Sequence, residues 1–385
     1  MKINKKGTQK FLKHNGNYIV IGIFLIIFTV ISLTGGLKMS TQFMLEKIAI
    51  SILLAVSLGL VVGFLGELSL GQAGFMCVGA YLGGKIAALL ASTALGNSFL
   101  TMLIAIIVGG ISAALTGVLI GLPALRLKGD YLAIVTLAFG EIVKTIFLNT
   151  SASSFGGPTG LETPRYDRKY LFIFAFLFVL AMLAIIQNLV RSKHGRAITA
   201  IRDSEIAARA TGINVTKYKL LVFGLSAFFA GVAGVFYSYS NFQVQCTKFD
   251  YNYSIEILVM VVLGGMGSIN GSIIAASLIT FLQIKLANVL TGNLAVLQNV
   301  IYAFILVVIV IYNNALKLKN FREKYNFRTL VIDKIFKKKN DPSIQKEDEA
   351  KWDRIPTKIN MDELLSMDVK VSESVVKPDK GGKNE

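Results

Sequence analysis

The sequence predicts an all-α protein built as a polytopic bundle of transmembrane helices, and two observations lead to this prediction. Hydrophobic residues make up 54% of the 385 residues, whereas soluble domains contain roughly 45–50% apolar residues. These residues also fall into runs of about 20, which is the length of helix that crosses the hydrocarbon core of a bilayer. A soluble fold of this length would have no core large enough for them, so a membrane protein is expected.

The candidate spans follow one another along the first four fifths of the chain. We expect about ten spans, and a count of roughly eight to eleven is compatible with the sequence. The division of 255–290 into two spans depends on the glycine-rich stretch "GGMGSING", Gly264 to Gly271, acting as a break. The expected spans cover residues 18–34, 45–65, 70–92, 99–122, 131–149, 170–190, 219–240, 255–271, 272–290 and 297–315.

Lysine and arginine residues predict the orientation of these spans, because cytoplasmic loops of membrane proteins are enriched in them. With ten spans, 13 such residues precede the first span or lie in inner loops, against six in outer loops. The inner ones are Lys2, Lys5, Lys6, Lys10, Lys13, Arg126, Lys128, Arg191, Lys193, Arg196, Arg202, Arg209 and Lys217. The outer ones are Lys38, Lys47, Arg165, Arg168, Lys169 and Lys248. Both termini are therefore expected in the cytoplasm, and the net charge of +17 does not indicate a nucleic-acid partner.

The chain is expected to have three regions. Residues 1–17 form a basic cytoplasmic N-terminus, and 18–315 form the transmembrane domain. The first span reads as a retained helix, because its apolar run is long and no small-x-small cleavage site follows it. Residues 316–385 form a basic, then mixed-charge cytoplasmic tail that is expected to be partly disordered. The basic part of the tail is either a solvated segment or an amphipathic helix attracted to anionic membrane lipid.

Recognisable catalytic chemistry is missing from the sequence. The stretch "GAYLGGKI" contains G-x-x-x-x-G-K, but Ile86 stands where a phosphate-binding loop needs Ser or Thr, and the surroundings are apolar. The two cysteines and two histidines form no metal-binding or disulfide pattern. We therefore expect no enzyme, no metal and no cofactor in this chain, and any ATP would be bound by separate subunits.

Four ionisable residues are candidates for positions inside the membrane, where such groups are usually functional. They are Lys85, Glu141, Lys144 and Lys285. Glu141 and Lys144 are three residues apart on one helix and can neutralise each other. This pair is either a packed ion pair or part of a proton relay, and the other two lysines can extend toward the headgroups.

The loop 191–218 is the most informative polar segment. Within it "SEIAARA" favours a helix that Ser204 can cap and Gly212 can end. A short apolar face would come from Ile201, Ala208 and Ile213. Such a helix is either a docking element for a motor protein or an ordinary amphipathic connector.

A second stretch, "GELSLGQAGFMCVGAY" from Gly66 to Tyr81, is rich in small and weakly polar residues. Ser69 and Gln72 can offer hydrogen bonds. Close approach of helices would be allowed by Gly66, Gly71, Gly74 and Gly79. The stretch is either a seam between packed helices or the lining of a path for a polar solute.

Five stretches together resemble a known family. "SEIAARATGINV" resembles the cytoplasmic E-A-A loop of ABC importer permeases, with Glu205, Ala207, Ala208 and Gly212 in the matching places. "GELSLGQAGFMCVGAY", "LRLKGDYLAIVTLAFGEI", "FGGPTGL" and "GGMGSINGS" resemble, in this order, successive motifs of branched-chain amino-acid permeases of the LivM type. The resemblance covers about residues 45–315. It departs at the end, where "YNNALKLKN" replaces the family's Pro-x-Gly-Leu stretch.

The resemblance implies an ABC importer permease fold with broken helices in a bacterial cytoplasmic membrane. It implies a homologous LivH-type permease, two cytoplasmic ATPases and an extracellular or periplasmic solute-binding protein as partners. Leucine, isoleucine or valine would be the solute, and urea or another small solute is the alternative within the class. A self-sufficient secondary transporter or channel is the alternative class, which would not need the loop 191–218.

Two groups of candidate site residues follow. The ATPase-coupling loop would use Arg202, Asp203, Glu205, Ala207, Ala208 and Gly212. The translocation path, or close helix packing, would involve Ser69, Gly71, Gln72, Gly74, Glu141, Gly264, Gly265 and Gly267.

Overall fold

The computed structural model describes residues 21–22, 25–32, 34, 36–93, 96, 98–125, 127, 129–164, 166–289 and 307. The chain divides into two units, Met1–Asn313 and Asn314–Glu385, and every described residue belongs to the first. The basic N-terminus 1–17 and the tail 316–385 lie outside the described residues. So does the expected last span, 297–315, except for residue 307.

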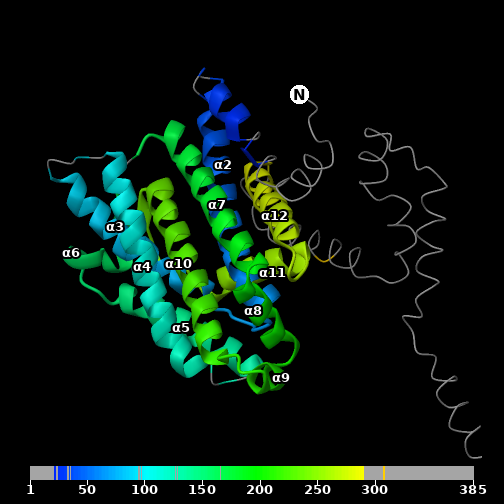
Figure 1. The fold of residues 1–385 in the computed structure, drawn as a ribbon. Helices are drawn as coiled ribbons and strands as arrows, with labels where there is room; N and C mark the ends of the chain where they lie inside the picture. Colours follow the sequence, from blue (N-terminus) through cyan, green and yellow to red (C-terminus); the bar gives the residue numbers. More distant parts are fainter. Residues whose placement is uncertain are drawn as a thin grey trace, which may run out of the picture. The chain divides into compact units, whose positions relative to one another are not determined.

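The described part contains seven helices that are long and apolar enough to cross a membrane. The first joins α2 (Met39–Gly59) to the π-helix η1 (Leu60–Leu65). The others are α3 (Gln72–Ala91), α4 (Phe99–Ala124), α5 (Asp130–Leu148), α7 (Arg168–Arg191), α10 (Val215–Asn241) and α12 (Ile269–Val289). The chain is therefore a multi-pass membrane protein made mainly of helices (Figure 1).

A shorter apolar helix, α11 (Tyr251–Gly264), precedes α12 and has 14 residues. This is less than the length of about 20 residues that spans a bilayer. The turn between α11 and α12 contains Gly265 and Gly267 with φ of 91° and 84°. Because glycine adopts positive φ without strain, the glycine-rich stretch divides 255–290 into two helices, as the sequence predicted.

Short elements connect the long helices. They are α6 (Ala152–Phe155), η2 (Gly157–Thr159), β1 (Leu161–Glu162), α8 (Lys193–Asp203), α9 (Glu205–Ala210), β2 (Gln243–Val244) and η3 (Cys246–Lys248). Strands β1 and β2 pair antiparallel, with Leu161 opposite Val244. This two-stranded ribbon is the single sheet among the described residues, so the prediction of a helical protein holds.

Helices α3, α4 and α10 lie side by side and form the most extensive contacts of the bundle (Figure 1). Their backbones approach closely at glycines. A Cβ atom added to Gly79 would lie 2.3 Å from the carbonyl oxygen of Gly231, and one added to Gly234 would lie 2.1 Å from that of Met76. Neither position can accept a side chain without moving the helices apart. The α3–α10 seam is thus of the small-residue type common in membrane bundles.

The segment 66–71 between η1 and α3 has no helical structure. The segment leads into the bundle, because Gln72, the first residue of α3, is buried against α2 and α10. The Gln72 side chain donates to the hydroxyl of Ser57 on α2 at 2.6 Å and contacts that of Ser226 on α10 at 3.4 Å. Within a membrane, backbone without helical hydrogen bonds must be covered by protein. Here the surrounding helices cover the segment.

Candidate functional site

Local sequence signals cause the loop 191–218 to form two short helices, α8 and α9. The Ser192 hydroxyl accepts from the backbone N–H of His194 at 3.1 Å and starts α8. The Ser204 hydroxyl accepts from the N–H of Ala207 at 3.3 Å and starts α9. Serine is a favoured N-cap because its oxygen satisfies an unpaired helix donor. The chain reverses after α9 at Gly212, whose φ is 82°.

One face of these two helices is buried against the bundle. Ile198, Ile201 and Ala208 are between 1% and 4% exposed, and Ile213 packs against the core from a partly buried position. The opposite face is open, with Ile206 78% exposed. The predicted apolar face is therefore confirmed, and the remaining face is free to contact another protein. Asp203, Ala207 and Gly212 are exposed there, whereas the Arg202 side chain, although 41% exposed, reaches back to Gly63 of η1.

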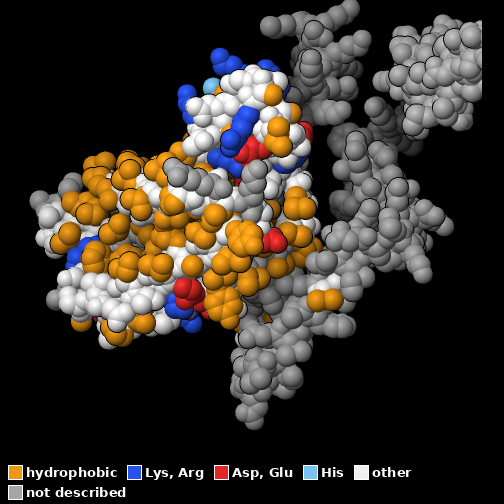
Figure 2. Space-filling view, turned by 90° about the horizontal axis from the view of Figure 1, so that it is seen from below, with side chains coloured by type: hydrophobic (Ala, Val, Ile, Leu, Met, Phe, Trp, Pro, Cys, Tyr) orange, Lys and Arg blue, Asp and Glu red, His pale blue; other side chains and the backbone are white. Residues whose placement is uncertain are grey.

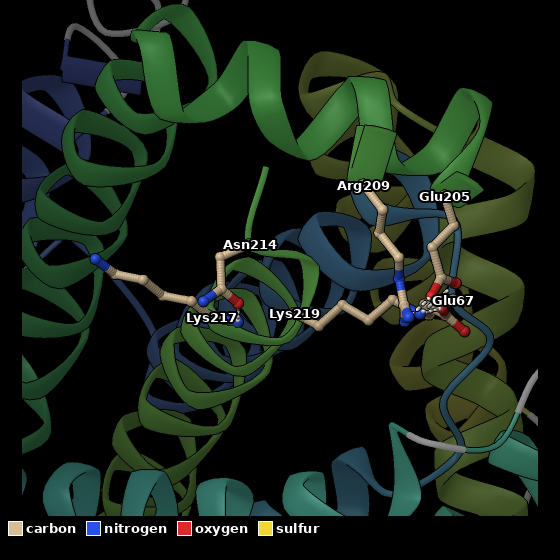
Figure 3. Close-up of polar contacts among 6 residues, drawn as sticks. All are labelled: Glu67, Glu205, Arg209, Asn214, Lys217 and Lys219. Carbon is tan, nitrogen blue, oxygen red and sulfur yellow. Dashed lines mark hydrogen bonds and ion pairs between the residues drawn. The ribbon is translucent and has the colours of Figure 1, made fainter. Parts of the chain in front are cut away.

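A buried ion cluster fastens α9 to the bundle (Figure 3). Lys219 on the first turns of α10 is 3% exposed and points toward two carboxylates. Its Nζ lies 2.5 Å from Oε1 of Glu67 and 3.2 Å from Oε2 of Glu205. The other oxygen of Glu205 accepts from Arg209 at 2.5 Å. A buried lysine needs such partners, because an unpaired charge away from water is costly.

The environment of Glu205 favours its charged form. Burial acts to raise the pKa of this carboxyl group, but the hydrogen bonds and positive charges of Lys219 and Arg209 outweigh it. The pKa of Glu205 is consequently below its ordinary value. The carboxylate is therefore ionised at neutral pH and holds both cations.

Arg202 fastens the end of α8 to the end of η1. Its Nη1 donates to the carbonyl oxygen of Gly63 at 3.2 Å, and its Nη2 lies 3.0 Å from Oδ1 of Asp203. Gly66 adopts a φ of 80°, and a Cβ atom there would lie 2.6 Å from Cγ of Arg202. The close approach of the arginine therefore requires glycine at position 66.

The structure places the candidate glycines of the α11–α12 turn against the same end of η1. A Cβ atom on Gly63 would lie 2.3 Å from the backbone nitrogen of Gly267, and one on Gly264 would lie 2.4 Å from the carbonyl carbon of Gly271. Gly264, Gly265 and Gly267 thus belong to a packed turn, and Gly267 lies beside Arg202 of the loop 191–218.

The candidates in the segment 66–74 all face other helices. Ser69 and Gln72 are 2% and 1% exposed. A Cβ atom on Gly71 would lie 3.1 Å from the carbonyl oxygen of Thr136, and one on Gly74 would lie 2.8 Å from Cα of Gly140. In this conformation, the close helix packing considered for the stretch is what the geometry displays for these four residues.

Glu141 joins α5 to the start of α11. Its Oε2 lies 2.9 Å from Nζ of Lys144, and its Oε1 accepts from the backbone N–H of Tyr251 at 3.0 Å. The glutamate side chain is 34% exposed, and it lines a narrow recess together with Leu70, Gly140, Asp250 and Ser254. The N-terminal end of α3 meets the N-terminal end of α11 here, since the N–H of Ala73 donates to the Ser254 hydroxyl at 3.1 Å.

Sequence reasoning missed the residues that hold these elements together. Glu67 lay inside a quoted motif without a role, and Lys219 stood at the first position of an expected span. The available signal was a charged residue at the edge of each apolar run. The other two membrane-depth candidates lie beside aromatic rings, with Lys85 5.9 Å from the Phe155 centroid and Lys285 5.7 Å from that of Phe281.

A second buried polar group lies at the other end of α10. Glu46 on α2 is 1% exposed and accepts from the Ser240 hydroxyl at 2.7 Å. Lys47 donates to Asn241 at 3.0 Å and lies 4.0 Å from the ring centroid of Tyr237. Lys47 is thus part of helix α2, which begins at Met39, and Arg168 begins α7. Lys47 therefore does not belong to an outer loop, where the orientation count had placed it, whereas Arg168 precedes the candidate span Tyr170–Arg191.

Apolar spanning helices, small-residue seams and a capped polar segment at one end define a polytopic helical membrane protein. Comparison with known sequences gives the family. The chain belongs to the family described as branched-chain amino acid transport system / permease component, whose sequence model matches residues 40–311. The family resemblance expected from the motifs is confirmed.

Several curated proteins are similar to this chain. The high-affinity branched-chain amino acid transport system permease proteins LivM of Salmonella typhimurium and Escherichia coli are each 37% identical over 262 residues. The alignment covers 60% of this chain and 60% of each relative, so the chain spans about three fifths of their length. The ribose import permease protein RbsC of Escherichia coli is 25% identical over 291 residues, which is 70% of this chain and 84% of that protein.

Proposed function

We propose that this chain is the membrane-spanning permease subunit of an ATP-driven importer for leucine, isoleucine and valine. The observation that carries the proposal is the coupling segment α8–α9, whose inner face is anchored by Lys219 and Arg202 while its outer face is free. A self-sufficient transporter has no need for such an element. The similarity to LivM proteins supports the choice of solute.

As part of an ATP-driven importer, this chain would depend on partner proteins for ATP hydrolysis, for the other half of the channel and for delivery of the solute. ATP would be bound and hydrolysed by two cytoplasmic ATPase subunits that grip the exposed face around Ile206 and Ala207. A homologous permease would supply the other half of the channel. A solute-binding protein on the extracytoplasmic side would deliver the amino acid, so that the permease itself needs little affinity for it.

The proposed orientation places the coupling segment and both termini in the cytoplasm of a bacterial cell, with about ten spans in its cytoplasmic membrane. The bias of Lys and Arg supports it even though Lys47 and Arg168 lie in helices. Cysteines introduced near Asn15 and Asn360 test this arrangement. An impermeant thiol reagent should leave both unlabelled in intact cells and label both after permeabilisation; labelling of either in intact cells would overturn it.

The proposed solute path runs along the surface of α5 and α11. The ion pair Glu141–Lys144 lies in the second half of α5 and is partly exposed, and charged groups at membrane depth face a protein interior or a water-filled cavity. The neighbouring surface of α11 adds the exposed residues Tyr251 and Asn252. We place the partner permease opposite this surface, with the candidate residues of 66–74 packed directly behind it.

Reconstitution tests the function. The complex of this chain with its partner permease, ATPases and binding protein would be placed in liposomes and offered labelled leucine, isoleucine, valine, urea and ribose. We expect ATP-dependent uptake of the three branched-chain amino acids and loss of that uptake in Glu205→Lys, with an unchanged amount of permease in the membrane. Uptake of ribose alone would move the chain to the specificity named for RbsC, and uptake without ATPases would identify a secondary transporter.

A further inference from the structure

The buried cluster around Lys219 lies between two segments that have different surroundings. On one side is α9, which is part of the coupling segment and largely exposed. On the other side is the segment 66–71, which leads into the bundle. Glu67 and Lys219 are 152 positions apart in the sequence, yet their side chains form an ion pair. Lys219 therefore connects a surface element to an internal one.

The direct contacts of α9 with the bundle are few. Ala208 provides a buried apolar contact, and Glu205 provides the ionic contact through Lys219. A Cβ atom on Gly212 would meet nothing within 4 Å, and in the chain reversal after α9 the partly buried Ile213 supplies a further apolar contact. Among the described residues, the polar contact from α9 to the helices of the bundle is the bond between Glu205 and Lys219 (Figure 3). In the same view, Lys217 points away from the cluster.

The segment 66–71 is in turn connected to three helices. The backbone N–H of Leu70 donates to the Thr136 hydroxyl on α5 at 2.9 Å. Just beyond it, Gln72 contacts Ser57 on α2, and Ala73 donates to Ser254 on α11. Because only two residues separate Glu67 from Leu70, we expect a displacement of Glu67 to reach the Leu70–Thr136 contact and the adjoining start of α3. Gly66, with its positive φ, marks the end of η1 where this irregular path begins.

We propose that Lys219 is a positioning residue that transmits movement of the coupling segment to the segment 66–71, and through it to the meeting point of α3, α5 and α11. This proposal rests on the proposed function, since the movement is imposed by an ATPase. Glu67 is the receiving group, and Glu205 is the group through which α9 acts on Lys219.

Single substitutions do not separate transmission from simple packing, because removal of one charge leaves its buried partner unpaired. The variant Glu67→Gln with Lys219→Met removes both charges and keeps the volumes of both side chains close to native. Glu205 retains Arg209 as its ion-pair partner in this variant. Lys219→Arg keeps the positive charge and serves as the conservative comparison. Glu162→Gln, an exposed carboxyl-to-amide change on β1, is the matched control.

The assembled complex in liposomes would be measured for ATP hydrolysis, for leucine uptake, and for labelling of Leu70→Cys by a thiol reagent. Labelling would be compared between the ATP-free and the vanadate-trapped complex. The native cysteines, Cys77 and Cys246, are buried. We expect the double variant to hydrolyse ATP at nearly the native rate while uptake per ATP falls about tenfold, the size of an ordinary coupling between sites. We also expect its Leu70→Cys labelling to become the same in both states.

Lys219→Arg should restore most of the uptake per ATP, and Glu162→Gln should behave as the native chain. Native uptake per ATP in the double variant would overturn the transmitting role. Failure of the double variant to assemble with the ATPases would also overturn it, because Lys219 would then serve assembly. Absence of ATP-dependent uptake in both the native complex and Glu162→Gln would instead show that the proposed function itself is wrong.

Discussion

The outer surface of α4 and the surface formed by α5 and α11 are both exposed and both largely apolar, but they differ in their polar groups. Every exposed side chain of α4 is apolar, including Ile104, Ile111 and Leu115. The exposed surface of α5 alternates isoleucines with Thr145 and the partly exposed pair Glu141–Lys144. Exposure alone therefore does not identify a lipid-facing surface in this chain, whereas charge content separates the two surfaces.

Figure 2 shows how apolar and charged side chains are distributed on one face of the molecule. In Figure 2 hydrophobic side chains cover the broad middle of the face, while most charged side chains gather in one cluster at its upper edge and a smaller group at its lower edge. An entirely apolar surface suits contact with lipid chains, which offer no hydrogen bonds. A surface that carries charge within a spanning helix suits a neighbouring protein or a solute path.

The largest effect is expected from a charge on α4. Leu115 is 65% exposed near the middle of this helix. Leu115→Arg should reduce the amount of inserted, folded protein strongly, because an arginine at the bilayer centre costs about 2.5–3.5 kcal/mol. Size-exclusion profiles of solubilised membranes measure this, with Leu115→Phe as the control. A native level of Leu115→Arg would mean that α4 faces protein or water.

The next effect concerns the inner surface of α5. Gly74→Leu should overpack the contact with Gly140 and destabilise the protein by about 1–3 kcal/mol, and uptake should fall with little change in apparent solute affinity. Ala138→Leu, which adds three carbons to the exposed surface of α5 against four for Gly74→Leu, should leave thermal stability unchanged. Equal thermal stability of the two variants would contradict the packing described for Gly74.

A smaller effect is expected from Glu141→Gln. The amide keeps an acceptor for the Tyr251 N–H but removes the ion pair with Lys144, and partly exposed pairs contribute about 0–1 kcal/mol to stability. We expect nearly native thermal stability with uptake reduced several-fold, because the surface of the path loses its charge balance. Unchanged uptake in Glu141→Gln combined with Lys144→Met would show that the pair is structural and does not border the path.

The smallest effect is expected from Ser112→Ala on α4. The Ser112 hydroxyl donates to the carbonyl oxygen of Gly109 within the same helix at 3.0 Å, so its loss leaves no buried group without a partner. Stability should change by less than about 0.5 kcal/mol, as judged by thermal unfolding in detergent. A loss of subunit assembly in this variant would indicate that α4 contacts a partner and would remove the contrast with α5.

Apolar runs predicted the long helices because their signal is local, and the break at Gly264–Gly271 was equally visible as a cluster of glycines. The helix that contains the expected span 45–65 begins earlier, at Met39, because Ser40, Thr41 and Gln42 interrupt the apolar run before position 45. Within the span, Glu46 and Lys47 are paired with Ser240 and Asn241, which lie 194 positions away in the sequence. No local pattern reveals such a pairing.

Some features of the candidate site could likewise be predicted from local sequence, and others could not. Ser204 as a cap and Gly212 as a helix end follow from residue types that have few other uses in those positions. The roles of Glu67 and Lys219 depend on the folded arrangement of η1, α9 and α10, so they could not be assigned from spacing. Likewise, the choice between packing and lining for Gly74 needed the position of Gly140 on another helix.

The backbone contact of α3 with α10 has a consequence for how substitutions accumulate in this chain. At Gly79 and Gly234 even a methyl group would collide with main-chain atoms of the opposite helix, and at Gly231 it would collide with the Gly109 carbonyl oxygen on α4. A saturation mutagenesis library selected for growth on an imported amino acid should therefore contain only glycine at these three positions. The exposed positions of α4 should accept almost any aliphatic residue. These positions would therefore change in sequence much faster than the three glycines.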